Sequence, residues 1–208
     1  MAYSDFTMRQ LNTLFGIKVI SAPIFDKKEI ALVIPSAHLR VDIEDAAGMP
    51  VFSEKAKSEL LKSPILKEVW RGNNRNFYCY SGYSLDVDKE KGLNGVCDFL
   101  FSKEYFVTEV ATPVFCLVEA KNRAIEEGIP QVVAEMYAAQ LLNTQQETPL
   151  PIIYGCVSNG FDWQFLALKD NIVTADTMRY YADEATLPKL LGILTHIVKQ
   201  YNYVPNQS

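Results

Sequence analysis

Three charged residues, Asp98, Glu119 and Lys121, lie in or directly after apolar segments, where together they could form a metal-dependent site. Glu119 and Lys121 end the apolar run 113–120, and their spacing of two places both side chains on one face of a strand. Asp98 lies in the shorter apolar run 96–102. Burying such charges is costly unless they are paired or bind a metal. A Mg²⁺ ion shared by Asp98 and Glu119 would offset that cost, because Mg²⁺ prefers oxygen ligands.

An acidic residue two positions before a lysine is a common pattern, so its context has to carry the argument. About two such triplets are expected by chance in a chain of this composition, and two occur, Glu119-Ala-Lys121 and Asp26-Lys-Lys28. The Asp26 triplet lies in a polar loop, whereas Glu119 closes an apolar strand and precedes a helix. That helix presents Gln131 and Glu135 on one face. The context therefore favours Glu119 and Lys121.

The elements that would position these residues follow from the spacing of apolar side chains. Helical periodicity predicts amphipathic helices, and apolar or tyrosine-rich runs bounded by turn residues predict strands. The order indicates an α/β (α+β) fold with a mixed central sheet flanked by helices. We expect an N-terminal helix through Leu14 followed by apolar runs 17–24 and 30–34, a helix over 54–70 kinked at Pro64, strands at 77–87, 96–102 and 113–120, a helix around 128–142, strands at 152–157 and 163–168, and a last helix over about 183–201.

Asp98, then Glu119-x-Lys121, then Gln131 in the following helix form an order that resembles the PD-(D/E)XK nuclease superfamily, whose fold is restriction-endonuclease-like. The helix beginning at Ser53-Glu54 is similar to the first helix of the nuclease domains in type I restriction motor subunits. The resemblance covers residues 52–168. It implies a nuclease-like domain over 51–208, with residues 1–50 as an extension packed on the core. The family's usual proline before the aspartate is replaced here by Cys97.

The resemblance implies metal-dependent hydrolysis of DNA, in restriction or repair, and a role for each matching residue. Asp98 and Glu119 would bind Mg²⁺ or Mn²⁺ with the Ala120 carbonyl, and Lys121 would orient or deprotonate water and offset charge on the phosphate. Gln131 would hold Lys121, water or substrate. Glu54 or Glu59 would complete the metal site or its outer shell, and their spacing of five makes it difficult for both to point inward. Some relatives cut as homodimers, so a homodimer is an expectation by analogy.

Structural interpretations compete with each of these roles. Glu119 and Lys121 could form only an ion pair, Gln131 could lie on a solvated helix face, and Glu54 could serve the helix dipole beside the Ser53 cap. The chain could then be a catalytically silent, nuclease-like module that binds a protein partner or nucleic acid. Alternating tyrosines at 78, 80 and 83 favour sheet packing over a base-stacking platform.

The charge distribution limits how the chain could bind nucleic acid. The formal net charge of -5 argues against unselective binding to nucleic acid or anionic membranes. Residues 55–121, however, carry 10 basic against 9 acidic side chains, and residues 55–75 are strongly basic. These basic residues either form a solvated helix face or contact a phosphate backbone. For the backbone we single out Lys57, Arg71, Arg75 and Arg123, while Lys55, Lys62 and Lys67 belong to the same basic stretch.

The remaining residue types exclude several other chemistries. Only two histidines occur, without metal-ligand spacing, so a histidine-based zinc site or a serine-histidine-aspartate triad is not expected. Four well-separated cysteines in apolar or aromatic surroundings predict buried free thiols. No signal-peptide pattern and no membrane-spanning apolar stretch is found, so we expect a cytoplasmic protein without membrane contact.

Overall fold

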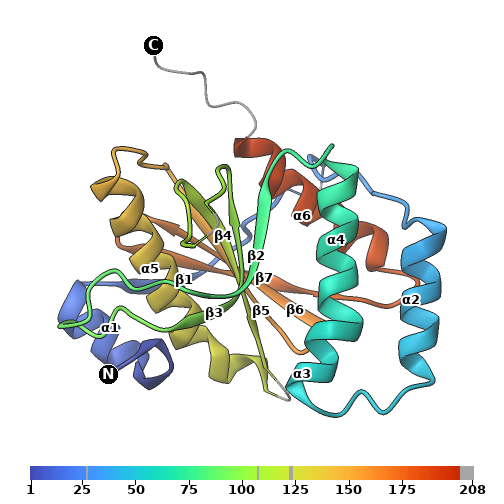
Figure 1. Ribbon diagram of the computed structural model, residues 1–208, viewed down its shortest axis with the longest axis horizontal. Helices are drawn as coiled ribbons and strands as arrows, with labels where there is room; N and C mark the ends of the chain where they lie inside the picture. Colours follow the sequence, from blue (N-terminus) through green and yellow to red (C-terminus); the bar gives the residue numbers. More distant parts are fainter. Residues whose placement is uncertain (27, 107, 122–123, 202–208) are drawn as a thin grey trace.

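A seven-stranded mixed sheet lies between two layers of helices in the computed structural model, which describes residues 1–26, 28–106, 108–121 and 124–201 (Figure 1). The strand order across the sheet is β1-β7-β6-β5-β4-β3-β2. The β1–β7 and β4–β5 pairs are parallel and the other pairs are antiparallel. The strands are β1 (Lys18–Ser21), β2 (Tyr78–Ser84), β3 (Val96–Ser102), β4 (Val114–Ala120), β5 (Ile153–Ser158), β6 (Asp162–Lys169) and β7 (Ile172–Tyr181).

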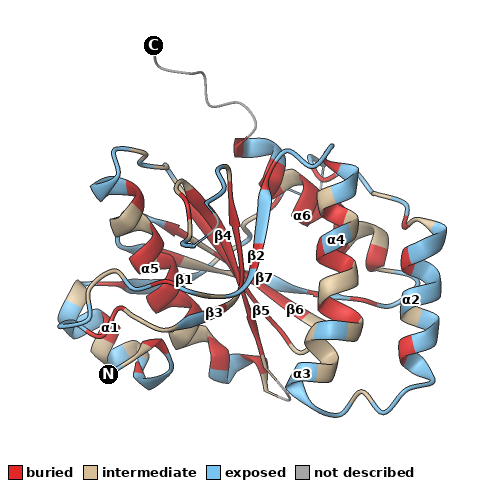
Figure 2. Cartoon of the chain, in the orientation of Figure 1, coloured by how far each residue is buried: buried red, intermediate tan, exposed pale blue. Residues whose placement is uncertain are grey.

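The helices cover both faces of the sheet and bury it almost completely at its centre (Figure 2). One face packs against α5 (Ile129–Gln145), with α1 (Met8–Phe15) and the short 3-10 turn η1 (Tyr3–Asp5) beside it. The other face packs against α4 (Ser63–Gly72) and α6 (Leu187–Tyr201), with α2 (Ala37–Ala47) outside them. No helix within the described ranges is long and apolar enough to span a membrane.

The predicted mixed α/β sheet flanked by helices is confirmed, and five of its strands lie where the apolar runs place them. These are β2 to β6, which the sequence predicts at 77–87, 96–102, 113–120, 152–157 and 163–168. Helix α2 and strand β7 are not predicted. Only Leu39 and Ala46 of α2 are buried, and β7 alternates irregularly around the buried Asp176. The apolar spacing of Leu39, Ile43 and Ala46 is helical but short, and β7 lacks a regular strand alternation.

Residues 1–50 contribute to the sheet and to both helical layers. Strand β1 adds to the outer edge of β7 in parallel, so one of the two apolar N-terminal runs is a strand. The other run, 30–34, has no regular secondary structure and lies outside the sheet, and its Val33 N–H donates to the Pro188 carbonyl. This segment crosses α6 at Gly192, where a Cβ atom would lie 2.2 Å from the Ala31 carbonyl oxygen.

The helix predicted over 54–70 is interrupted by a π-turn. It consists of α3 (Glu54–Lys57), the π-turn η2 (Ser58–Lys62) and α4. Ser53 caps its start by accepting from the Ala56 N–H, as the sequence suggests. The interruption precedes Pro64, which has no N–H to donate to the residue four positions earlier, so the turn before it widens. This widening directs Lys62 into the protein, where it is fully buried.

The cysteines follow the sequence prediction except at one position. Cys97, Cys116 and Cys156 are buried free thiols, as predicted. Cys79 is a free thiol but exposed, because its side chain lines the open hollow between α4 and the edge strand β2. The prediction that all four are buried is therefore wrong at Cys79. The remaining short element, the 3-10 turn η3 (Ile125–Gly128), leads into α5.

Candidate active site at the ends of strands β3 and β4

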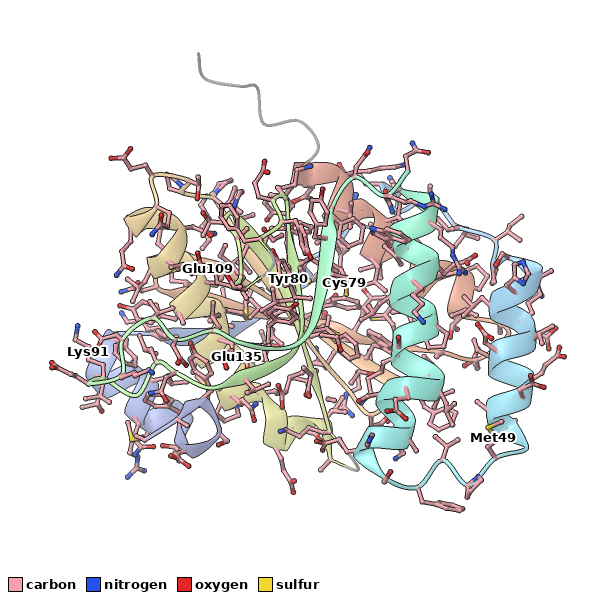
Figure 3. The ribbon with its side chains drawn as sticks, viewed as in Figure 1. Met49, Cys79, Tyr80, Lys91, Glu109 and Glu135 are labelled. Carbon is pink, nitrogen blue, oxygen red and sulfur yellow. The ribbon has the colours of Figure 1, made fainter. Side chains whose placement is uncertain are left out.

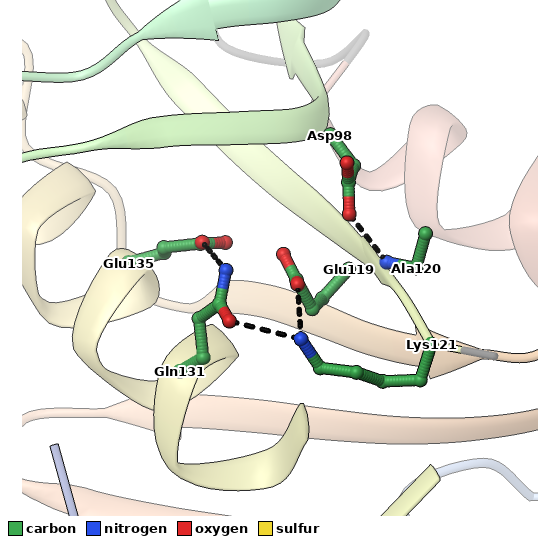
Figure 4. Close-up of polar contacts among 6 residues, drawn as sticks. All are labelled: Asp98, Glu119, Ala120, Lys121, Gln131 and Glu135. Atoms are coloured by element: carbon green, nitrogen blue, oxygen red, sulfur yellow. Dashed lines mark hydrogen bonds and ion pairs between the residues drawn. The ribbon is translucent and has the colours of Figure 1, made fainter. Parts of the chain in front are cut away.

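Asp98 lies where strands β3 and β4 separate. The two strands pair from Ser102–Val114 as far as Phe99–Val118, and the pairing ends before Asp98. The Asp98 Oδ2 atom instead accepts a hydrogen bond from the Ala120 N–H at 2.7 Å (Figure 4). A side-chain carboxylate therefore replaces the lost backbone acceptor and holds the ends of the two strands together.

A continuous chain of polar contacts runs from the end of β4 to helix α5. The Lys121 ammonium donates to Glu119 Oε1 at 2.8 Å and to Gln131 Oε1 at 3.0 Å. The Gln131 amide in turn donates to Glu135 Oε1 at 3.1 Å. Figure 4 shows Gln131 between Lys121 and Glu135, with Asp98 above Glu119. The structure thus brings Asp98, Glu119, Lys121 and Gln131 together.

Two carboxylates of this site are buried and incompletely hydrogen-bonded. Glu119 is 2% exposed and Glu135 is 0% exposed. Within the described part of the chain, no donor group contacts Glu119 Oε2 or Glu135 Oε2, and the two carboxyl groups lie close enough to share a proton. Burial, followed by the charge of Asp98, raises the pKa of Glu119 to about 7 despite the opposing effect of Lys121. Burial, followed by the charge of Glu119, raises the pKa of Glu135 well above its ordinary value.

Lys121 is held as a cation by this acidic surrounding. Burial opposes its charge, but the hydrogen bond to Glu119 and the charges of Glu119, Glu54 and Asp98 together raise its pKa. Gly128, which has no side chain, leaves space for the methylene groups of Lys121. A Cβ atom at Gly128 would lie 3.0 Å from Lys121 Cγ and Cε and 2.6 Å from Val157 Cγ1. A residue without a side chain at the start of α5 therefore positions the lysine.

Lys62 is a second lysine near the site, which the sequence places on a basic surface. It is 0% exposed, and its ammonium has no hydrogen-bond partner within the described residues. Burial lowers its pKa to about 8, while the charges of Asp98, Glu54 and Glu119 act in the opposite direction. The prediction that Lys62 belongs to a solvated or phosphate-binding surface is therefore wrong, because the π-turn directs its side chain into the protein.

Glu54 and Glu59 both line one hollow with Asp98, of about 480 Å³. Both side chains are exposed, so this hollow does not decide which of them could complete a metal site. The π-turn that begins at Ser58 changes the helical phase between them. Their surroundings differ, since the charge of Glu54 acts on Lys62 and Lys121, whereas Glu59 pairs with Lys55 at 3.9 Å on the surface.

The basic residues singled out for a phosphate backbone do not form one patch. Arg71 lines a hollow with His38 and Glu68 that is separate from the hollow lined by Asp98. Arg75 places its guanidinium over the Trp70 ring, 5.2 Å from its centroid. Lys57 lies on α3 near the tip of the β5–β6 hairpin, where it approaches Gly160. Arg123 lies outside the described residues.

The carboxylates suit a hard divalent cation by their donor chemistry. Asp98 and Glu119 offer oxygen ligands, and the unpaired buried Glu119 Oε2 is an acceptor that a cation would satisfy. Over residues 1–26, 28–106, 108–121 and 124–201, no group of three or more His, Cys, Asp or Glu side chains is arranged to hold a metal ion. Two carboxylates with a backbone carbonyl, water and phosphate are the ligands that Mg²⁺ commonly uses.

Sequence reasoning finds Asp98, Glu119, Lys121 and Gln131 but misses three further residues of the site. Glu135 is noted only as a neighbour of Gln131 on its helix, Lys62 only as a surface cation, and Gly128 only as a helix start. The helical spacing of four between Gln131 and Glu135 is the signal that could have found Glu135. No family model matches the chain, and a search of curated proteins finds no similar sequence. The candidate site therefore depends on its own geometry.

Proposed function

We propose that the chain is a metal-dependent phosphodiesterase that hydrolyses DNA, of the PD-(D/E)XK type. One observation carries the proposal. At the separated ends of β3 and β4, a buried carboxylate with an unpaired oxygen, Glu119, lies beside Asp98 and within 2.8 Å of the Lys121 ammonium. Carboxylates gathered in this way are costly to bury, and a divalent cation is the ordinary means of stabilising them.

The residues divide the work of phosphodiester hydrolysis among them. Asp98 and Glu119 would hold the cation, which supplies Lewis-acid stabilisation of the phosphate and lowers the pKa of water. Lys121 would hold a water or a phosphate oxygen at its ammonium and stabilise the negative charge that develops on phosphorus-bound oxygens. Gln131 fixes the direction of Lys121, and Glu135 fixes the amide orientation of Gln131.

The arrangement of elements supports the same proposal. Helix α5 connects β4 to β5, which pairs with β4 in parallel. The start of α5 therefore lies near the end of β4, where Gln131 contacts Lys121 and Glu135 contacts Gln131. Helix α3 and the π-turn η2 place Glu54 and Glu59 in one hollow with Asp98. A restriction-endonuclease-like fold is part of this proposal.

Cleavage assays test the proposal directly. Plasmid, linear duplex and single-stranded DNA are incubated with Mg²⁺ or Mn²⁺ and the wild-type chain, Glu119→Gln or Lys121→Met. Removing a metal ligand or the charge-stabilising lysine is expected to lower the rate by at least about 100-fold. Glu184→Gln, which changes an exposed carboxylate outside the site, serves as the matched control. Cleavage that is equally fast in all four proteins would sink the proposal.

A non-catalytic module is the second candidate, because the network is partly satisfied without a cation. Asp98 is bonded to Ala120, and Glu119 is paired with Lys121. Calorimetric titration with Mn²⁺ discriminates between the two. No heat of binding at millimolar Mn²⁺, together with unchanged stability in Asp98→Asn, would favour the module.

A further inference from the structure

A groove leads from the candidate active site along the free edge of β2. The hollow that contains Asp98 shares Ser63, Lys67, Ser81 and Phe99 with a second hollow of about 360 Å³. The second hollow lies between α4 and β2, the edge strand on which Figure 3 labels Cys79 and Tyr80. The two hollows are therefore one surface, with carboxylates at one end and Lys67 in the middle.

Aromatic rings line the far end of this groove. Tyr78 and Tyr105 stack with their centroids 5.3 Å apart and their planes 26° apart. As residues they are 44% and 51% exposed, and Tyr105 also stacks on Tyr80, with ring centroids 6.1 Å apart. The open part of the pair is therefore the side that neither Tyr80 nor the partner ring covers. Trp70 lines the same hollow, and the Arg75 guanidinium covers its ring. Tyr78, for which the alternation favours packing within the sheet, packs against Tyr105 and stays partly exposed.

Tyr80 supports the platform without being part of its exposed surface. It is 4% exposed, and its hydroxyl accepts hydrogen bonds from the Phe106 and Ala111 N–H groups. The same hydroxyl donates to the Glu104 carbonyl. These bonds fix the backbone on both sides of Tyr105, so its ring is held against Tyr78 before any ligand arrives. A rigid, exposed aromatic pair loses little conformational entropy on binding a flat ligand.

We infer that this groove binds the unpaired bases of single-stranded DNA, on the aromatic pair Tyr78 and Tyr105, while the attached backbone passes Lys67 to reach Asp98. The inference deepens the proposed function and rests on it for the choice of nucleic acid. Bases stack on aromatic rings largely regardless of sequence, and lysines along the groove attract the phosphates. Paired bases inside a duplex have their faces covered by neighbours, so the platform selects single strands or frayed ends.

Around the aromatic hollow the charges suit a polyanion better than a peptide, because Lys67 is the charged residue that lines it in the described part of the chain. The carboxylates Glu54, Glu59 and Asp98 lie at the other end of the groove, where the proposed cation would offset their charge. A peptide could pair with the free edge of β2, but such pairing needs neither exposed rings nor cations. Lys67 is exposed in the middle of the groove, and Arg75 adds a second cation at the aromatic end. Continuity with the hollow of Asp98 adds a separate reason, because a strand bound on the rings would extend toward the residues proposed to cut it.

Binding is measured by fluorescence anisotropy of a labelled oligothymidylate and of a labelled duplex, in EDTA so that no cleavage occurs. We expect the single strand to bind at least about 10-fold more tightly than the duplex, and the double variant Tyr78→Ala, Tyr105→Ala to lose about 10-fold or more of that affinity. Tyr78→Phe with Tyr105→Phe keeps the rings and should bind as wild type. Lys67→Gln should weaken binding and reduce its salt dependence.

Tyr181→Ala is the matched control, since Tyr181 is 43% exposed on β7, remote from β2 in the sheet. The inference is overturned if oligothymidylate does not bind, if the duplex binds equally well, or if both tyrosines can be replaced by alanine without loss. An extended peptide that displaces the bound oligothymidylate equally well from wild type and from the ring variants would also overturn it. Ring-dependent binding without any cleavage would support the groove and reject the nuclease, whereas cleavage with ring-independent binding would do the reverse.

Discussion

Three buried side-chain atoms without hydrogen-bond partners in the described residues belong to Lys62, Glu119 and Glu135, and all three residues act electrostatically on the candidate site or belong to it. Unpaired buried polar atoms are rare in folded proteins because each is destabilising. These three groups lie near Asp98, so the folded state carries a desolvation cost in this part of the protein. Clusters of buried, electrostatically strained groups are typical of sites that bind a charged ligand.

Lys62 allows this destabilisation to be measured at a single residue. Its pKa is about 8 in the folded chain against an ordinary value of 10.5, so folding disfavours the charged form. Below pH 8 the lysine is charged in both states and the penalty is present in full. Between pH 8 and 10.5 the folded state releases its proton first, and stability rises with pH. We therefore expect Lys62→Met to raise the free energy of unfolding at pH 7 by up to about 3 kcal/mol.

The measurement is urea unfolding at pH 7 and near pH 10, comparing Lys62→Met with wild type. The gain from the substitution should shrink at the higher pH, because the wild-type lysine is then neutral in the folded chain. Lys67→Met, which changes an exposed lysine of the adjoining helix, should alter stability by less than about 0.5 kcal/mol at both pH values. A variant that is less stable than wild type at pH 7 would show that the buried ammonium is compensated.

At this scale the sequence predicts the residues whose position depends on local periodicity. The alternation of a strand places Glu119 and Lys121 together, and the helix that follows brings Gln131 to them. Lys62 escapes prediction because its direction depends on one widened helical turn. Glu135 is missed as a site residue because its burial depends on how α5 packs on the sheet, which the sequence of α5 does not specify by itself.

At the scale of elements, the site depends on how β4 and α5 are joined, since both carry site residues. Asn143, which is fully buried near the end of α5, brackets Val114 at the start of β4. Its Oδ1 accepts from the Val114 N–H at 2.8 Å, and its Nδ2 donates to the Val114 carbonyl at 2.7 Å. One amide side chain thus satisfies both backbone groups of a residue inside the core.

Asn143→Ala is expected to lower the free energy of unfolding by about 3 kcal/mol, because it leaves the Val114 N–H and carbonyl buried without partners. The change is measured from the midpoint and slope of urea unfolding. Gln140→Ala is the matched control on the same helix, where the amide donates to the Asp170 carbonyl at an exposed position. Its expected cost is about 0.5 to 1 kcal/mol. Equal losses in the two variants would contradict the role assigned to Asn143.

Burial also explains which elements the sequence predicts. Strands β3 to β5 have continuous apolar runs because they are buried on both faces, so their positions follow from composition. Helix α2 touches the core mainly through Leu39 and Ala46, and the run 30–34 lies across α6 instead of pairing. These segments take their conformation from tertiary contacts, which a local pattern does not contain.

At the scale of the whole molecule, the carboxylate site makes stability depend on pH and on divalent cations. The folded pKa of Glu119 is raised to about 7 from 4.5, so its contribution to stability is present below pH 4.5 and is lost as the pH rises through 7. Glu135 shifts in the same direction. Because the two groups are coupled, they lose their protons as a pair, and neutralising either relieves the other.

We therefore expect the metal-free chain to be less stable at pH 8 than at pH 5, with up to about 3 kcal/mol of the difference due to Glu119. Glu119→Gln and Glu135→Gln should each reduce this difference, whereas Glu184→Gln should preserve it. Millimolar Mn²⁺ should raise the melting temperature of wild type more at pH 8 than at pH 5, where Glu119 is protonated. The measurement is thermal unfolding across pH with Mn²⁺ or EDTA. A wild-type chain that Mn²⁺ stabilises equally at both pH values, or in Glu119→Gln as much as in wild type, would place any bound cation elsewhere than at these carboxylates.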